Sequence, residues 1–252
     1  MKSLTRHIPN LLTCFSLSFG FYAAILGISG NYFGAMVAIL VAAVFDFADG
    51  LAARLLKAYS AMGKELDSLA DVISFGVAPG MMLFGFMDRI LHSLLWTDSP
   101  VCKLLLLVAF VIPVFSGLRL AKFNIDERQK TSFLGLPVPA HAILWSALIT
   151  LFAGDSRAFD GIFPQLTAIL ASIPSVALLI GVAVAACATS LLLVSEIPMF
   201  SLKITSLSLA KNRLPFLFIF TSALLILLFG IAGIAATMAL YILLSMIAYK
   251  PD

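Results

Sequence analysis

Long apolar runs, separated by short breaks of Gly, Pro and charged residues, extend over the whole chain. A run of about 20 apolar residues is long enough for an α-helix to cross a lipid bilayer. The pattern therefore predicts an all-α fold, a polytopic integral membrane helical bundle of about eight transmembrane helices. We expect the spans at residues 10–29, 32–56, 61–87, 102–123, 138–154, 173–195, 214–229 and 231–249.

Two places leave the number of spans open. Residues 159–172 fit either an interfacial helix or an early start of the sixth span, and the last apolar run is divided only at Gly230. Six or seven spans therefore also fit the pattern. Composition favours one membrane domain over residues 1–252, because 62% of the residues are hydrophobic, 12% are charged and the mean hydropathy is +1.09.

Basic residues divide unevenly between the two sides of the predicted bundle. With eight spans, one side carries thirteen Lys and Arg residues, and the other carries Arg89, Lys103 and Arg157. Basic loops are retained in the cytoplasm, so we expect a multi-pass protein of the cell (inner) membrane with both termini cytoplasmic. The net charge of +3 then reflects topology and contact with anionic lipid, and nucleic-acid binding is not expected.

Four aspartates interrupt the apolar pattern between residues 46 and 71. One aspartate at the centre of a membrane helix costs about 2.5–3.5 kcal/mol, so the group requires a cation, a partner or a watery cavity. At about 100° per residue, the aspartates fall on one face of each of two successive spans. These faces consist of Asp46, Asp49, Gly50 and Ala53 in the second span, and of Gly63, Asp67 and Asp71 in the third.

Two helices joined by a short link and lying antiparallel would direct all four carboxylates into one cleft. Mg²⁺ and Mn²⁺ prefer carboxylate and water oxygens, and the stretch has no Cys or His for Zn²⁺. We therefore expect a Mg²⁺ or Mn²⁺ site. The small residues on the same faces have two interpretations: they leave room for a ligand near the backbone, or they let membrane helices pack closely.

The spacing Asp46-x-x-Asp49-Gly50-x-x-Ala53-Arg54, followed after eight residues by Gly63-x-x-x-Asp67-x-x-x-Asp71, resembles the signature of the CDP-alcohol phosphatidyltransferase family. The resemblance implies a membrane enzyme that transfers a phosphatidyl group from a CDP-linked lipid to an alcohol and releases CMP. It implies that Asp46, Asp49 and Asp67 hold the metal, and that Asp71 reaches the metal and acts as the general base. It implies that the CDP-lipid contacts Asn10, Thr13, Asp49, Gly50, Ala53, Arg54 and Gly63.

Two of these residues also have structural explanations. Asn10 follows Pro9 at the predicted start of the first span, where an ordinary helix cap explains it equally well. Arg54 can hold a diphosphate bidentately, or can pair with an aspartate and keep the helices in register, and we favour the pairing.

Three later motifs resemble the phosphatidylserine synthases of the family: residues 72–80, residues 117–124 with 135–139, and residues 194–203. We expect Pro79 to kink the third span. The role of Glu196 stays open, and His141 is expected to be a polar residue satisfied at the membrane interface. Residues expected to contact the acceptor or a phosphate are Arg119, Lys122, Asn124 and Lys130, although basic residues at a helix end often only extend toward the lipid headgroups.

The expected reaction, by resemblance, transfers the phosphatidyl group of CDP-diacylglycerol to L-serine at the surface of the membrane lipid. The catalytic part would cover about residues 8–203, and the last two spans, about 214–249, would pack against it. Family members are often homodimers, and the resemblance implies a homodimer here. Two alternatives stay open: another acceptor, glycerol 3-phosphate or inositol phosphate, and a divalent-cation transporter whose aspartates bind the transported ion.

Overall fold

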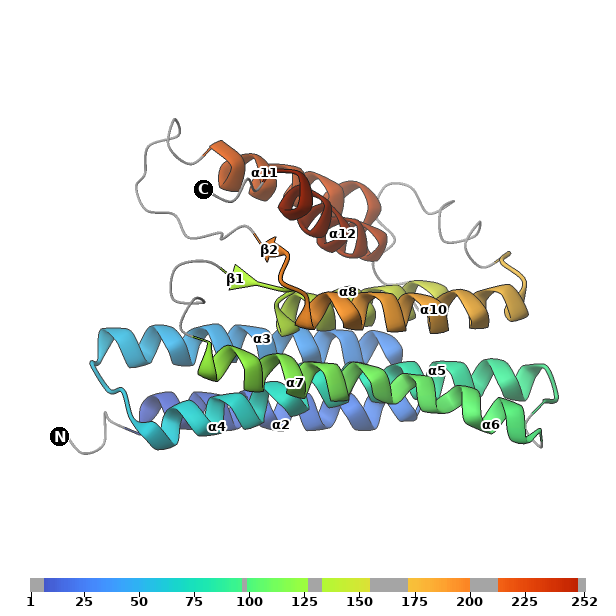
Figure 1. Ribbon diagram of the computed structural model, residues 1–252, viewed down its shortest axis with the longest axis horizontal. Coiled ribbons are helices and arrows are strands. Elements are labelled where there is room, and N and C mark those ends of the chain that lie inside the picture. The colour runs from blue at the N-terminus through green and yellow to red at the C-terminus, as the bar shows by residue number, and fades with distance from the viewer. Residues whose placement is uncertain (1–6, 97–98, 127–132, 155–171, 200–212, 249–252) are drawn as a thin grey trace.

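The computed structural model describes residues 7–96, 99–126, 133–154, 172–199 and 213–248 (Figure 1). These residues form eight helical segments, which confirms the all-α bundle, and the ends differ from the predicted spans by six residues or fewer. The segments are α2 (Ile8–Ile28), α3 (Tyr32–Leu55), α4 (Ala61–Asp71) continued by a π-helical turn (Val72–Val77) and α5 (Ala78–Ser93), α6 (Pro100–Leu106) continued by a 3₁₀ turn (Leu107–Phe110) and α7 (Val111–Ile125), α8 (Val138–Phe152), α10 (Ser175–Val194), α11 (Arg213–Phe229) and α12 (Ile231–Ala248).

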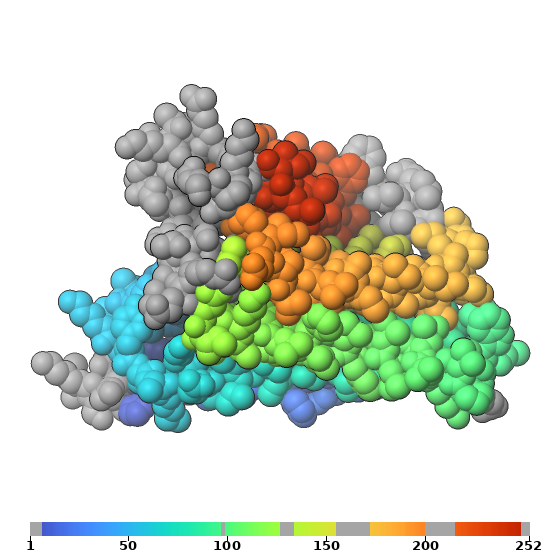
Figure 2. All heavy atoms as spheres, in the orientation of Figure 1, coloured from blue at the N-terminus to red at the C-terminus, as the bar shows by residue number. Residues whose placement is uncertain are grey.

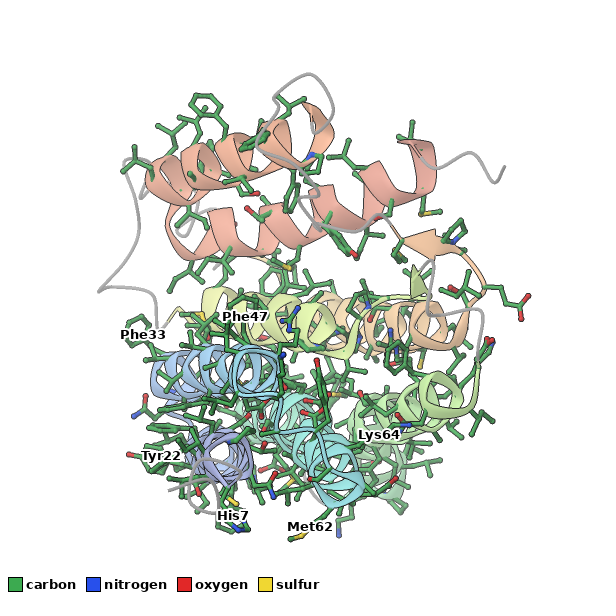
Figure 3. The ribbon with its side chains drawn as sticks, turned by 90° about the vertical axis from the view of Figure 1, so that its left-hand side faces the viewer. His7, Tyr22, Phe33, Phe47, Met62 and Lys64 are labelled. Atoms are coloured by element: carbon green, nitrogen blue, oxygen red, sulfur yellow. The ribbon has the colours of Figure 1, made fainter. Side chains whose placement is uncertain are left out.

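The described helices have the length and surface of a membrane protein. Five of the eight segments are long and apolar enough to cross a bilayer, and the other three are shorter apolar helices. Large apolar side chains are exposed: Phe47 is 67% exposed, and Tyr22, which Figure 3 shows at the outer edge of the bundle, is 53% exposed. Such a surface suits contact with lipid tails, and we conclude that the protein is membrane-embedded.

The helices pack in layers. In Figure 1, α2, α3, α4, α5 and α7 form the lower part, α8 and α10 lie above them, and α11 and α12 lie beyond α8. Figure 2 shows α7 and α10 running side by side across one face. The start of α2 and the turn between α3 and α4 lie at the same end of the molecule, and the connection from α5 to α6 lies at the opposite end.

Small residues allow the close packing at the centre of the bundle. Ala23, Ala35 and Ala42 are fully buried, and α2 packs along α3 over much of its length. Larger fully buried side chains, including Trp145 of α8 and Phe75 of the π turn, belong to the same hydrophobic core. Helices α2 and α3 therefore form a closely packed pair, as small residues allow between membrane helices.

A π-helical turn interrupts the third segment where the sequence predicted a kink at Pro79. The Ala78 N–H donates to the carbonyl of Ile73, five residues earlier. Proline has no N–H for the carbonyl four residues before it, so the regular ladder cannot continue through Pro79. The irregularity was therefore expected, but its form, a π turn that ends before Pro79, was not.

A two-stranded antiparallel sheet joins two of the motifs noted above. β1 (Phe133–Leu134) pairs with β2 (Pro198–Met199), and the Gly135 N–H donates to the Ile197 carbonyl at 2.9 Å. Gly135 has φ +76°, and a Cβ there would collide with the Leu193 carbonyl, so only glycine fits. The motifs at 135–139 and 194–203 therefore meet in space, although residues 200–203 lie outside the described part.

One question about the span count is answered, and one stays open. Gly230 separates α11 from α12 and has φ 57°, so the division of the last apolar run is confirmed. Residues 159–171 lie outside the described residues.

Candidate functional site

The aspartates of α3 and α4 converge at one end of the bundle. Asp46, Asp49 and Asp67 each offer a carboxylate oxygen, and these atoms lie within 4.8 Å of one another. The carboxyl group of Asp71 lies within hydrogen-bonding distance of that of Asp46. The helical spacing thus brings all four side chains together.

The donor set fits a hard divalent cation. The cluster contains only carboxylate oxygens, which Mg²⁺ and Mn²⁺ prefer. Carboxylates in direct contact repel one another unless a proton or a cation lies between them. In addition, Asp71 Oδ1 is buried and has no hydrogen-bond partner in the described part of the chain. A cation between the carboxylates would offset their mutual repulsion and would give Asp71 Oδ1 a partner.

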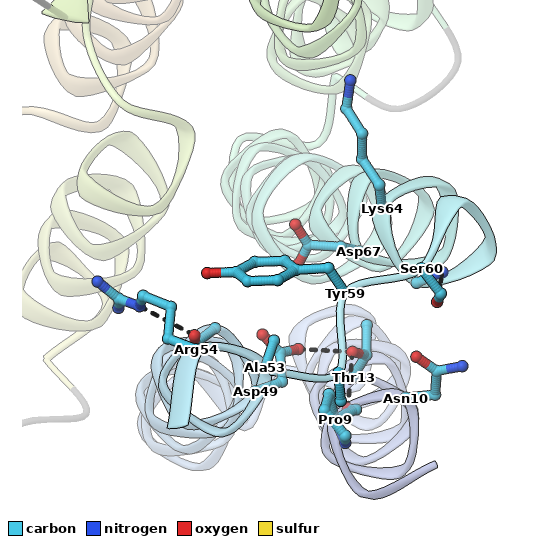
Figure 4. Close-up of a pocket in the computed structure, with 13 residues that line it drawn as sticks. Pro9, Asn10, Thr13, Asp49, Ala53, Arg54, Tyr59, Ser60, Lys64 and Asp67 are labelled. Carbon is cyan, nitrogen blue, oxygen red and sulfur yellow. Dashed lines mark hydrogen bonds between the residues drawn. The ribbon is translucent and has the colours of Figure 1, made fainter. Parts of the chain in front are cut away.

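Helix α2 fixes the orientation of Asp49. The Thr13 hydroxyl lies 2.6 Å from Asp49 Oδ2, and both residues are buried. The same hydroxyl lies 3.1 Å from the Pro9 carbonyl, so it has a second acceptor within its own helix (Figure 4). The shorter contact, to a carboxylate, is the stronger one. Thr13 therefore lies beside Asp49, and its contact with a CDP-lipid stays a prediction.

A cavity of about 350 Å³ opens beside Asp49 and Asp67. Figure 4 shows that it lies between the N-terminal end of α2, the end of α3 and the start of α4. It is lined by Pro9, Asn10, Thr13, Asp49, Gly50, Ala53, Arg54, Ala58, Tyr59, Ser60, Gly63, Lys64 and Asp67. Every residue for which the resemblance implies contact with a CDP-lipid is in this lining.

The two glycines of the site have different roles. A Cβ at Gly50 would meet no atom within 4 Å, so packing does not require glycine there. A Cβ at Gly63 would lie 2.9 Å from both Asn10 Oδ1 and Ser60 Oγ, so these two side chains would have to shift to admit alanine. Gly50 thus borders open space in the cavity, whereas Gly63 faces the Asn10 and Ser60 side chains.

Asn10 is not the cap of its helix. Helix α2 begins at Ile8 with His7 at the N-cap, and no side chain caps it. Asn10 instead faces Gly63 across the cavity, and Ser60 caps α4 by accepting a hydrogen bond from the Gly63 N–H at 2.9 Å. The cap explanation is therefore wrong for Asn10, whose side chain is available to a ligand in the cavity.

Arg54 does not pair with an aspartate. Its Nε donates to the Gly50 carbonyl at 3.0 Å, one turn earlier in α3. Within the residues that the structure describes, Arg54 forms no ion pair. The favoured pairing is thus not present, because the side chain lies along its own helix at the rim of the cavity. A role in holding a diphosphate stays a prediction.

Arg119 is buried inside the bundle. It is 6% exposed, and its guanidinium carbon lies 4.7 Å from the centroid of the Phe123 ring. The charge interacts with Asp71 and Tyr241, and Nε is buried with no hydrogen-bond partner in the described part. Arg119 lies on the buried face of α7 together with Ile112, Ser116 and Leu120. The helical spacing of these four residues is visible in the sequence and could have indicated that Arg119 is buried.

The other residues expected to contact the acceptor have structural partners. Lys122 Nζ lies 3.5 Å from Glu196 and 3.3 Å from the Val194 carbonyl. Glu196, whose role the sequence left open, is therefore the ion-pair partner of Lys122. Asn124 Nδ2 donates to Ser68 Oγ at 2.9 Å and joins α7 to α4. Lys130 lies outside the described residues. Among the described members of this group, Arg119 has an electrostatic interaction with one of the aspartates, Asp71.

His141 is buried in the bundle and not at its surface. It is fully buried, its Nε2 lies 3.0 Å from Thr189 Oγ1, and Trp145 Nε1 donates to the same pair. Nε2 therefore has the hydrogen-bond partner expected of a satisfied polar residue, and these contacts join α8 to α10. The depth of His141 relative to the membrane interface stays a prediction.

Five lining residues were not assigned to the site from the sequence: Pro9, Ala58, Tyr59, Ser60 and Lys64. Tyr59 and Ser60 lie in the link between the two aspartate helices, and Lys64 lies in the first turn of α4. A short link between two site helices necessarily borders their shared cleft, and this signal could have identified Tyr59. The charge of Lys64 alone does not show which way its side chain points, so the sequence did not assign it to the site.

Comparison with known proteins gives a family match over most of the chain. Residues 6–187 match the profile of the CDP-alcohol phosphatidyltransferases. The chain is similar to a CDP-diacylglycerol–serine O-phosphatidyltransferase of Bacillus subtilis (strain 168), with 35% identity over 134 residues, or 53% of this chain and 70% of that protein. A protein of the same name from Helicobacter pylori (strain ATCC 700392 / 26695) is 33% identical over 138 residues, 54% of each chain. An archaetidylserine synthase of Methanothermobacter thermautotrophicus is 33% identical over 150 residues, 58% of this chain and 60% of that protein.

Proposed function

Because the chain belongs to the CDP-alcohol phosphatidyltransferase family, we propose that it transfers the phosphatidyl group of CDP-diacylglycerol to the hydroxyl group of L-serine, giving phosphatidylserine and CMP. The observation that carries the proposal is the group of Asp46, Asp49 and Asp67 beside a cavity of about 350 Å³. The names of the bacterial relatives support serine as the acceptor. The chain covers only about half to 70% of these relatives, so the acceptor and the lipid backbone need a direct test.

The donor lipid would occupy the cavity between α2, α3 and α4. Asp46, Asp49 and Asp67 would hold Mg²⁺ or Mn²⁺, with Asp71 adjacent. When bound, the ion would neutralise the diphosphate and stabilise the departing CMP. Thr13 would keep Asp49 oriented, and the open space at Gly50 would admit the nucleotide and its diphosphate.

Asp71 would take the proton of the serine hydroxyl as the general base. The serine oxygen forms a bond to the phosphorus of the phosphatidyl group, the bond from that phosphorus to the CMP oxygen breaks, and CMP leaves with the electron pair. Asp71 interacts electrostatically with the other aspartates and with Arg119, which supports this role. The guanidinium of Arg119 would bind the serine carboxylate.

We further propose that the aspartate end faces the cytoplasm, in the cell (inner) membrane. Four described basic residues support this orientation: Arg54 at the end of α3, Lys57 in the link, Lys64 at the start of α4 and Lys122 at the end of α7. The catalytic part would be residues 8–203, with α12 packing on α8, and the active form would be a homodimer.

The test is CMP release by the purified protein in lipid nanodiscs containing CDP-diacylglycerol. Serine, glycerol 3-phosphate and inositol phosphate are compared as acceptors, each with Mg²⁺, with Mn²⁺ and with EDTA. Serine-dependent release that EDTA abolishes is expected, with phosphatidylserine as the lipid product. Release with a phosphorylated acceptor alone would overturn the serine assignment, and no release with any acceptor would overturn the transferase assignment.

A further inference from the structure

The π-helical turn Val72–Val77 directly follows Asp71, and the reaction proposed above gives it no role. Such turns are rare and are frequent at functional sites. A π turn contains one additional residue, so it rotates Asp71 by about 100° relative to α5, compared with a continuous α-helix. The contacts that hold this turn therefore set the direction in which Asp71 points.

Ser74 ties the π turn to α2. Its side chain is fully buried, and its hydroxyl donates to the Ser16 carbonyl at 3.0 Å. A Cβ at Gly20 would overlap with the Cα, Cβ and Oγ atoms of Ser74. The backbones of α2 and the π turn are thus in direct contact, which only glycine at position 20 permits.

The opposite side of the turn packs on α7. A Cβ at Gly76 would lie 3.0 Å from Ser116 Cβ and 3.4 Å from Pro113 Cα. The π turn is therefore held between two helices, and the hydrogen bond from Ser74 is its polar contact with α2.

The contact with Ser74 lies on the same face of α2 that orients Asp49. Thr13, Ser16 and Gly20 are spaced at i, i+3 and i+7 and belong to the buried stripe of this helix. We propose that Ser74, together with Gly20, is a positioning residue that fixes the π turn and thereby holds Asp71 against Asp46. Helix α2 would then align the carboxylates of both site helices for a divalent cation. The inference rests on the proposed function for that cation, and Ser74 acts through Asp71 without touching substrate.

The experiment measures Mn²⁺ binding to the purified full-length protein in nanodiscs by EPR, without substrate. Ser74→Ala removes the hydrogen bond and is expected to weaken Mn²⁺ binding by about tenfold, as loss of supporting contacts around metal ligands commonly does. Ser16→Ala is the matched control, because Ser16 accepts through its backbone carbonyl and its own Oγ has no partner among the described residues. This control should keep the affinity of the unaltered protein.

A second pair of variants tests the same contact from α2. Gly20→Ala should weaken Mn²⁺ binding further, whereas Gly181→Ala in α10, where a Cβ would meet no atom within 4 Å, should not change it. Equal Mn²⁺ affinity in Ser74→Ala and Ser16→Ala would overturn the proposal, as would a lower melting temperature of Ser74→Ala with unchanged affinity. If the unaltered protein binds no Mn²⁺, the metal assignment of the proposed function fails first, and the positioning role fails with it.

Discussion

The hydroxyl of Thr13 lies 2.6 Å from a carboxylate oxygen of Asp49, and this contact connects α2 to the aspartates of α3. Both side chains are buried, so the hydrogen bond has little competition from water. The first helix therefore contributes to the site although it carries no carboxylate.

Thr13→Val keeps the shape of the side chain and removes the hydrogen bond. We expect the metal concentration for half-maximal CMP release to rise about tenfold, because Asp49 loses its fixed orientation. Ser18→Ala on the same helix is the control, since the Ser18 hydroxyl bonds only to the Cys14 carbonyl among the contacts described. An unchanged metal dependence in Thr13→Val would mean that Asp49 needs no support from α2.

Gly50→Ala tests whether glycine is needed at this position to admit a ligand or to let helices pack. A Cβ at this position meets no protein atom within 4 Å, and alanine favours a helix over glycine by about 1 kcal/mol. We therefore expect an unchanged or higher melting temperature together with a higher KM for CDP-diacylglycerol. Gly181→Ala should change neither quantity. A lower melting temperature with normal KM would show that Gly50 serves packing after all.

Helical period and bilayer thickness made part of the structure predictable. The spans follow from the length of the apolar runs, and the convergence of Asp46, Asp49 and Asp67 follows from their spacing. The different roles of Gly50 and Gly63 could not be predicted, because they depend on which atoms a neighbouring helix places opposite each glycine.

The π turn and the burial of Arg119 were not predicted, because both depend on contacts between helices far apart in sequence. Ser74 meets Gly20 of α2, and α7 packs against α10. A local pattern indicates which face of a helix is buried but does not identify the helix that covers it. The sequence therefore left two interpretations of Arg119 open, contact with the acceptor or extension toward the lipid headgroups, and its burial argues against the second.

Arg119→Lys tests the acceptor side of the site. Lysine keeps the charge but lacks the planar group that binds a carboxylate with two hydrogen bonds, so the KM for serine should rise at least about tenfold. The KM for CDP-diacylglycerol should change much less, because its proposed cavity lies between α2, α3 and α4. Equal increases in both KM values would instead indicate a general disturbance of the bundle.

Lys122 and Glu196 should contribute only to stability. Their side chains are 36% and 64% exposed and lie 3.5 Å apart, and partly exposed ion pairs contribute about 0–1 kcal/mol. A double-mutant cycle with Lys122→Met and Glu196→Gln should give a coupling energy within that range and an unchanged KM for serine. A clear rise in that KM in Lys122→Met alone would return Lys122 to the acceptor site.

Asp71→Asn removes the proposed general base while keeping the size of the side chain. Asparagine cannot accept the serine proton, so CMP release should be abolished, whereas binding of CDP-diacylglycerol should be largely intact. Asp88→Asn is the control, because Asp88 lies on α5, away from the cavity, and pairs only with His92 among the ion pairs of the described residues. Binding is measured by titration with the lipid in nanodiscs, and turnover by CMP release. Retained turnover would show that Asp71 is not the general base. Loss of both binding and turnover would show that Asp71 helps to bind the donor lipid and its metal, instead of transferring the proton.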